Sequence, residues 1–133
     1  MKKTYELEEY IKNEITRKLG KLDWMHIKFC EWEKKTAEGT YVFAKLGKYH
    51  IQFIEKGKLR EEVITENREE VLWRIIKIFS FDIALESVKK EDLCKKEFRK
   101  VFFEKQLEVY SLFGKEFVER RRREIEEIFV ENP

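Results

Sequence analysis

The hydrophobic and polar positions of residues 40–65 predict three short β-strands joined by two tight turns. Apolar and polar side chains alternate over residues 49–54 and again over residues 59–63, which is the two-residue period of a strand. Residues 41–46 are more continuously apolar, as expected of a strand in the interior of a sheet. Gly47 and Gly57 separate the runs, and glycine readily adopts the positive φ angles that hairpin turns require.

A fourth strand is predicted ahead of these three. Within residues 22–33, Ile27 and Phe29 alternate with more polar neighbours. Residues 34–39 form a polar stretch that reads as a loop. We therefore expect a four-stranded antiparallel meander, with the segment 22–33 as its first strand.

Helical periodicity predicts one helix before the sheet and one directly after it. The first helix is expected to be capped by Thr4 and to end before Gly20, with apolar residues at i+4 spacing between them. The second begins at Asn67, where Glu70 completes a pattern similar to a capping box. This second helix is apolar over most of its circumference as far as Leu85, so it should be buried and central.

Two further helices follow. One should begin near Glu91 or Asp92, whose carboxylates suit a helix N-terminus, and end at Gly114. The last runs from Lys115 to about residue 130, and its apolar stripe includes Arg121. The predicted fold class is α+β: an N-terminal helix, a four-stranded antiparallel meander sheet, then three C-terminal helices packed on the sheet, all in a single domain of residues 1–133.

Composition narrows the function only a little. Of the 133 residues, 42% are hydrophobic and 42% are charged, which suits a packed core under a heavily charged surface. Lys plus Arg (29) nearly balances Asp plus Glu (27), so the net charge of +2 indicates no particular class of partner. The most apolar segment, residues 71–85, contains Arg74, Lys77 and Asp82, and the N-terminus has no signal-peptide pattern. We expect a soluble cytoplasmic protein of bacterial type.

No residue pattern indicates catalysis, a metal or a cofactor. Cys30 and Cys94 belong to no metal-binding spacing and are predicted to be buried free thiols. His26 and Cys30 are four residues apart, but the further ligands that zinc needs are missing. His50 has no neighbouring serine, cysteine or carboxylate in a pattern that would make it a general base. We predict no catalytic, cofactor-binding or metal-binding residue, and expect that the protein is not an enzyme.

Two groups of charges have more than one interpretation. Glutamates gather where the sheet leads into the second helix, either as a solvated acidic patch or as a docking surface for a basic partner. Residues 120–123 are four arginines that are read either as a phosphate-binding arm or, more simply, as a helix face paired with glutamates at i,i+4. The glutamates are Glu61, Glu62, Glu66, Glu69 and Glu70, and the i,i+4 pairs are Glu116–Arg120, Glu119–Arg123, Arg120–Glu124, Arg122–Glu126 and Arg123–Glu127.

Parts of the chain from Gly39 to Pro133 resemble the immunity proteins of bacterial polymorphic toxin systems, specifically the family immunity protein sixty-three. Lysine stands at positions 56 and 100, where that family's pattern has arginine. The residues that carry the resemblance are Phe98, Arg99, Lys100, Phe103, Gln106, Leu107 and Glu108; Glu124, Ile125, Ile128, Asn132 and Pro133; and Tyr49, His50, Glu55, Lys56 and Gly57.

The resemblance implies a non-enzymatic cytoplasmic protein that binds a cognate toxin protein and blocks it, without a cofactor. Polar groups on the sheet and the acidic residues after it are the candidate contacts for that partner. They are His50, Gln52, Arg60, Glu62, Glu66, Glu69 and Glu70.

Two other functions stay open at this level. A nucleic-acid-binding module would use Lys45, Lys48 and Lys58 together with Arg120–Arg123, although nucleic acid is the less favoured partner. A small-ligand fold would need convergent polar groups in an apolar cavity between sheet and helices. The oligomeric state does not follow from the sequence.

Overall fold

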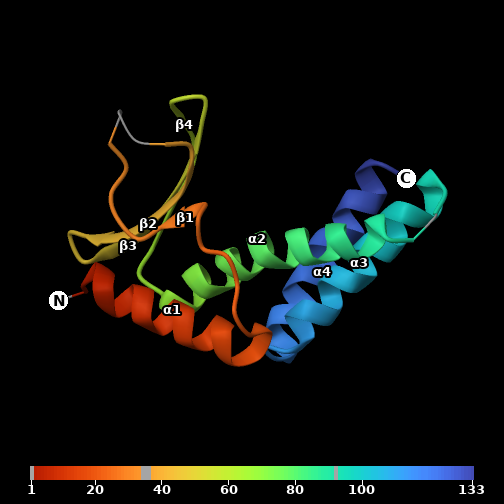
Figure 1. Ribbon diagram of the computed structural model, residues 1–133, viewed down its shortest axis with the longest axis horizontal. Coiled ribbons are helices and arrows are strands. Elements are labelled where there is room, and N and C mark those ends of the chain that lie inside the picture. The colour runs from red at the N-terminus through yellow and green to blue at the C-terminus, as the bar shows by residue number, and fades with distance from the viewer. Residues whose placement is uncertain (1, 34–36, 92) are drawn as a thin grey trace. The chain divides into compact units, whose positions relative to one another are not determined.

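A computed structural model describes residues 2–33, 37–91 and 93–133 of the protein (Figure 1). It contains two compact units, one ending at Leu72 and one beginning at Trp73. The predicted α+β class is confirmed: a helix precedes a four-stranded sheet, and three helices follow it. The expectation that residues 1–133 form one domain stays a prediction.

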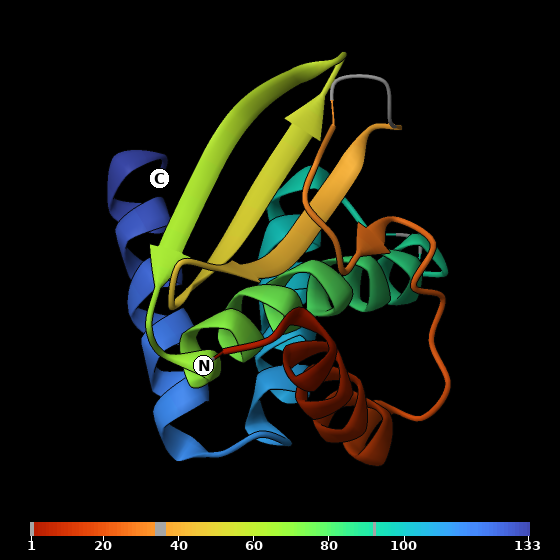
Figure 2. The ribbon, with the colours of Figure 1, turned by 90° about the vertical axis from the view of Figure 1, so that its left-hand side faces the viewer.

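The sheet of the first unit has its strands in chain order, and Figure 2 shows the three long strands side by side. β2 pairs with β3 and β3 with β4 in antiparallel fashion, as predicted. The strands are β1 (Ile27–Lys28), β2 (Gly39–Lys45), β3 (Lys48–Glu55) and β4 (Lys58–Thr65).

The first strand corrects the prediction in length and in direction. β1 has two residues in place of the predicted segment 22–33, and it pairs with β2 in parallel, so the sheet is mixed. Parallel neighbours cannot be joined by a tight hairpin, because both strands must start from the same end of the sheet. The N–H of Thr40 donates to the carbonyl oxygen of His26 at 2.9 Å. A Cβ on Gly39 would lie 2.8 Å from that oxygen, so the close approach requires glycine.

Both predicted hairpins have two-residue turns. Leu46 and Gly47 have φ angles of 53° and 77°, and Lys56 and Gly57 have φ angles of 53° and 72°. Two consecutive positive φ angles are the geometry of a type I′ turn, whose twist matches that of the flanking strands. The predicted turns at Gly47 and Gly57 are therefore confirmed.

A β-bulge interrupts the pairing of β3 with β4. Ile54 pairs with Leu59 but Phe53 pairs with Glu61, so Arg60 is an extra residue on β4. Side chains alternate across a sheet, and one inserted residue therefore shifts the later residues of β4 to opposite faces. Leu59 and Val63, which the alternation placed together, consequently lie on different faces of the sheet.

The first helix, α1 (Thr4–Leu19), lies against β2 within the first unit. Its apolar stripe is buried at Leu7, Ile11 and Ile15. Thr4 does not cap the helix as predicted. Instead its hydroxyl oxygen accepts a 3.0 Å hydrogen bond from the N–H of Ala44 and so joins the helix to the sheet.

The second helix, α2 (Arg68–Lys89), begins in the first unit and continues in the second. The Asn67 side chain caps it as predicted, because its oxygen accepts a hydrogen bond from the N–H of Glu69 at 2.9 Å. Most of the apolar side chains of α2 are buried, as its apolar circumference predicts, although Phe81 is 47% exposed. The buried residues of α2 are Val71, Leu72, Trp73, Ile75, Ile76, Phe79, Ser80, Ala84 and Val88.

The second unit also contains α3 (Lys95–Ser111) and α4 (Lys115–Glu131), which contact each other. The predicted start of α3 near residue 91 is wrong, because Cys94 is extended with ψ of 163° and helical geometry begins after it; Asp92 lies outside the described residues. α3 also ends before Gly114, which precedes α4 with a φ of 120°.

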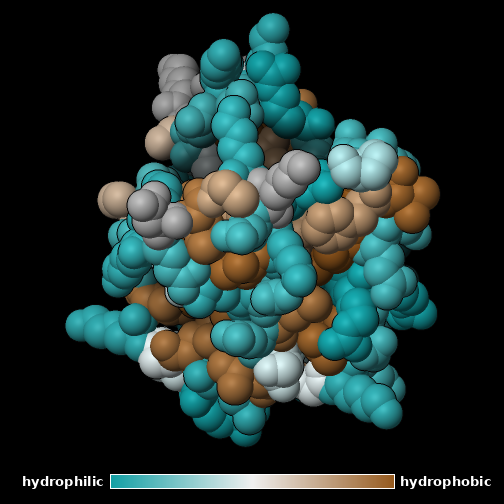
Figure 3. Space-filling view, turned by 90° about the vertical axis from the view of Figure 1, so that its right-hand side faces the viewer, coloured by the Kyte–Doolittle hydropathy of each residue, from teal (hydrophilic) through white to brown (hydrophobic). Residues whose placement is uncertain are grey.

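An aromatic and aliphatic cluster joins α2 to α3. Ala84, Val88 and Phe102 are its buried centre, and Phe102 contacts both Phe81 and Phe103 edge-on, at ring-centroid distances of 5.0 and 5.4 Å. Its other members are only partly buried. Figure 3 views the molecule from the side on which α2 ends and α3 begins, and hydrophobic surface gathers there among hydrophilic side chains.

Candidate partner-binding surface

Three of the predicted contact residues meet on one face of the sheet. Gln52 pairs with Glu62 across the strands, and its side-chain Nε2 donates to the Glu62 Oε2 at 2.5 Å. The Nδ1 of His50 lies 3.7 Å from the same carboxylate oxygen. His50 also stacks on Phe43, with 4.9 Å between ring centroids and an angle of 4° between the planes. The pairing of β3 with β4 thus gathers His50, Gln52 and Glu62 into a polar cluster.

The chain that follows β1 borders this face. Lys45 forms a 2.8 Å ion pair with Glu31, and the hydroxyl of Tyr41 donates to the carbonyl oxygen of Ala37. Two buried polar atoms in this unit, the Nε1 of Trp32 and the Oε1 of Gln52, have no hydrogen-bond partner within the described part of the chain. Unpaired buried polar groups are costly, so these two atoms reduce the stability of the unit.

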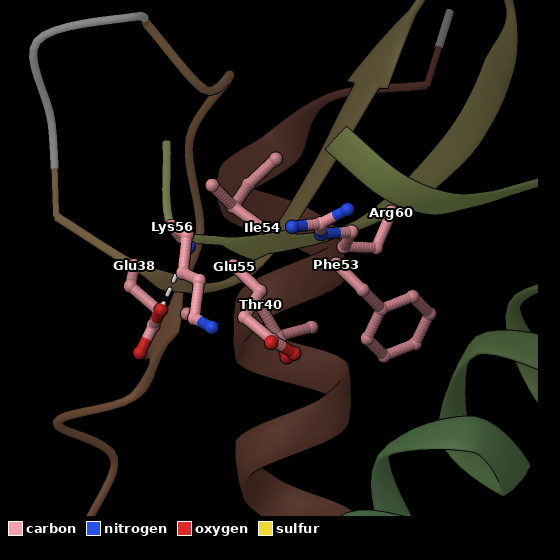
Figure 4. A pocket seen from close by; sticks show the side chains of 8 residues that line it. Glu38, Thr40, Phe53, Ile54, Glu55, Lys56 and Arg60 are labelled. Carbon is pink, nitrogen blue, oxygen red and sulfur yellow. Dashed lines mark hydrogen bonds between the residues drawn. The ribbon is translucent and has the colours of Figure 1, made fainter. Parts of the chain in front are cut away.

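Arg60 lies apart from this cluster, at the bulge. It lines a hollow of about 370 Å³ at the end of the sheet, and Figure 4 shows its guanidinium on the side of Ile54, away from the ring of Phe53. Across the hollow, the N–H of Lys56 donates to the Oε1 of Glu38 at 2.9 Å. The guanidinium of Arg60 has no ion-pair partner among the described residues, so it is free to bind an acidic group.

The acidic residues follow the end of β4. Glu66 and Glu69 are exposed, while Glu70 is half-buried in the first turn of α2. Arg68 beside them lies over the ring of Tyr10, 4.0 Å from its centroid. Burial and then the nearby carboxylate of Glu69 raise the pKa of the Tyr10 hydroxyl, which therefore stays neutral. Glu66, Glu69 and Glu70 therefore form a negatively charged surface where β4 leads into α2.

The basic hairpin of the nucleic-acid hypothesis does not form. Lys45 pairs with Lys48 at one end of the sheet, whereas Lys58 pairs with Glu55 at the other end. Lys45 is further neutralised by Glu31. The three lysines therefore do not make one phosphate-binding patch.

The run Arg120–Arg123 is also not a continuous basic arm. Arg121 is only 5% exposed, and the guanidinium of Arg120 lies over the Trp73 ring at 3.8 Å. Arg122 pairs with Glu119, which is an i,i+3 spacing and differs from the predicted i,i+4 pair with Glu126. Arg123 forms no ion pair with described residues, so its two predicted pairs are wrong as well. The prediction that Arg121 belongs to the apolar stripe is confirmed.

Arg121 belongs to a buried hydrogen-bonded chain that links all three helices of the second unit. Its Nε donates to the Oε1 of Gln106 at 3.0 Å, and Gln106 donates in turn to the Oγ of Ser80 at 3.1 Å. The Ser80 hydroxyl donates to the carbonyl oxygen of Lys77. At the other end, Arg121 and the Lys77 Nζ contact the Glu124 Oε1 at 2.7 and 3.1 Å. This network satisfies polar groups in a core, which indicates a structural role.

Glu124 makes that network dependent on pH. Burial alone would raise the pKa of its carboxyl, but hydrogen bonds from Arg121 and Lys77 outweigh this and hold the pKa below its ordinary value. A lowered folded-state pKa contributes stability that is present above the unfolded-state pKa and is lost as the pH falls through the folded-state value. Between pH 6 and pH 3, we expect the free energy of unfolding to fall more for the wild type than for Glu124→Gln. Equal slopes in chemical denaturation at these pH values would contradict the prediction.

The two cysteines differ from the prediction in their burial. Both Cys30 and Cys94 are free thiols as predicted, but they are exposed, which corrects the expected burial. Their positions explain the difference, since Cys30 follows the short β1 and Cys94 precedes α3. No group of three or more potential ligands that could hold a metal ion occurs among the described residues. Within that same part of the chain, no helix has the length and apolar character that crossing a membrane requires.

Comparison with known proteins identifies a matching family. The model of a protein family described as immunity protein 63 matches residues 45–127, which is more than half of the chain. The matched part begins at the end of β2 and includes β3, β4, α2, α3 and most of α4. It is narrower than the expected range 39–133, and like that range it leaves out α1 and β1. No curated protein and no solved structure matches the chain.

Proposed function

Because this chain belongs to the immunity protein 63 family, we propose that it binds a cognate bacterial toxin domain and neutralises it. The family match is the observation that carries the proposal. Inhibition would be by occlusion: the protein covers the working surface of the toxin and performs no reaction itself. It would act in the cytoplasm of the cell that it protects and would need no cofactor.

The surface proposed for the toxin consists of the polar face of β3 and β4 with the acidic residues after it. Its charges differ along its length, because Arg60 is basic while Glu62, Glu66 and Glu69 are acidic. Such a pattern steers and orients a partner of complementary charge. The proposed contacts are His50, Gln52, Arg60, Glu62, Glu66, Glu69 and Glu70.

Charge reversal tests this surface. We expect Glu66→Lys with Glu69→Lys to weaken toxin binding by about 10- to 100-fold, since two attractions become repulsions. The matched control is Glu126→Lys with Glu127→Lys, which makes the same change in net charge at exposed positions of α4. Affinity is measured by calorimetry with the C-terminal domain of the toxin encoded beside this gene. Circular dichroism checks each fold, because lysine near a helix N-terminus costs about 0.3–1 kcal/mol.

The outcomes separate the function from the surface. If the wild type forms no complex with the toxin domain and does not relieve its toxicity, the proposed function is wrong. If the complex forms but both double variants bind equally well, the function stands and the toxin occupies another surface.

A further inference from the structure

The outer edge of β4 has no strand beside it. β4 is last in the strand order and pairs only with β3. Among the described residues, no further hydrogen bond involves the backbone of β4 apart from its pairing with β3. The outer edge of this eight-residue strand is therefore open, and its outward-facing backbone donors and acceptors meet solvent.

The register identifies which backbone groups face outward. The N–H groups of Thr40 and Ala44 point away from β3, because they donate to His26 and to Thr4. In an antiparallel pair the hydrogen-bonded and non-bonded positions alternate, so their partners Phe53 and Tyr49 direct their backbone groups toward β4.

The same alternation continues into β4. Phe53 and Tyr49 pair with Glu61 and Thr65, whose backbone groups consequently face β3. Glu62 and Ile64, at the intervening positions, direct their N–H and C=O groups outward.

Side chains leave this edge accessible and give it a polarity. Leu59 and Ile64 are 44% and 50% exposed. The start of the strand is basic at Lys58 and Arg60, and its middle is acidic at Glu61 and Glu62. An incoming strand is thus favoured in one direction, with basic residues opposite the two glutamates.

A second copy of this chain fits the edge poorly. If two β4 strands paired antiparallel about a twofold axis centred on Glu62, this residue would lie opposite the copy's Glu62. Like charges directly opposite are destabilising, and the charges and the bulge protect the edge against self-association. A foreign segment that carries lysine or arginine at that position meets no such repulsion.

We propose that the cognate toxin binds by strand addition: an extended basic segment of the toxin pairs with the outer edge of β4. This inference rests on the proposed function and names how the partner is held. Backbone hydrogen bonds to Glu62 and Ile64 supply affinity, while Glu61 and Glu62 select a basic segment.

The test removes one outward donor. Ile64→Pro deletes the N–H that a partner strand would use, and proline is tolerated at an edge where that N–H faces solvent. Ile64→Ala is the matched control, because it removes the same side chain but keeps the N–H. With the C-terminal domain of the neighbouring toxin, we expect Ile64→Pro to raise Kd at least about tenfold over Ile64→Ala. Circular dichroism and the unfolding midpoint verify that both variants fold.

A second measurement does not depend on the proline variant. In the wild-type complex, amide hydrogen exchange at Glu62 and Ile64 should slow relative to the free protein. Equal affinity of the two Ile64 variants, or unchanged exchange at both amides in a formed complex, would overturn strand addition and leave the proposed function intact. Failure of the wild type to bind the toxin domain would overturn both.

Discussion

Replacing Trp73 with alanine should lower the free energy of unfolding by about 3–5 kcal/mol, the usual cost of removing a buried tryptophan. Trp73 is buried, with only 1% of its surface exposed. Its ring centroid lies 5.5 Å from that of Tyr110 and 3.8 Å from the guanidinium of Arg120. Its Nε1 donates to the carbonyl oxygen of Phe117 at 3.2 Å. The alanine variant loses these contacts and leaves a cavity among the three helices, which denaturant unfolding followed by circular dichroism would measure.

Trp73→Phe separates the ring from its hydrogen bond. Phenylalanine keeps an aromatic surface for Tyr110 and Arg120 but cannot donate to Phe117, so we expect a smaller loss of about 1–2 kcal/mol. A loss below 1 kcal/mol in the alanine variant would mean that Trp73 does not organise the core of this unit.

The elements that the sequence predicted best are those with local signals. The hairpin turns follow from Gly47 and Gly57, because each turn requires two residues with positive φ and glycine supplies one of them at little cost. The cap of α2 follows from Asn67, whose side chain bonds a helix N–H two residues ahead. By contrast, β1 is held by its parallel pairing with a strand that begins eleven residues later, and no local pattern reports such pairing.

The candidate site shows where local patterns stop being sufficient. A regular hairpin closed by the turn at Lys56 and Gly57 would have placed Gln52 opposite Glu61. The bulge at Arg60 shifts the register by one residue, so Gln52 and His50 meet Glu62. The polarity of these residues was readable in the sequence, but their meeting depends on one inserted residue that no turn signal marks.

Arg121 shows the same limit from the opposite direction. Its place on the apolar stripe of α4 predicted burial, whereas its place in a run of four arginines suggested a solvated face. Arg121 is buried as the stripe predicts, because Gln106 on α3 and Glu124 on α4 bind its guanidinium inside the core. Those partners become recognisable only after the helices have packed.

Replacing Arg121 with methionine should therefore destabilise the protein by about 3 kcal/mol, although methionine fills a similar volume. The substitution leaves the Oε1 of Gln106 buried without a donor and removes one of the two cations on Glu124. The same substitution at Arg122, whose only described partner is the exposed Glu119, should cost less than about 1 kcal/mol. Chemical denaturation of both variants measures the difference, and similar losses would mean that the buried network contributes nothing beyond a surface ion pair.

A double-mutant cycle then isolates the hydrogen bond between Arg121 and Gln106. Gln106→Leu alone leaves the Arg121 Nε without its acceptor, but adding it to Arg121→Met removes both polar groups from the core together. Removing both side chains leaves neither polar group buried without its hydrogen-bond partner. The double variant should therefore be more stable than the sum of the single losses predicts, by at least about 1 kcal/mol. The Ser80 hydroxyl still donates to the carbonyl oxygen of Lys77 in the double variant, so it keeps a hydrogen-bond partner. Strict additivity would show that the two side chains are stabilised separately and that the chain from Ser80 to Arg121 is not one cooperative network.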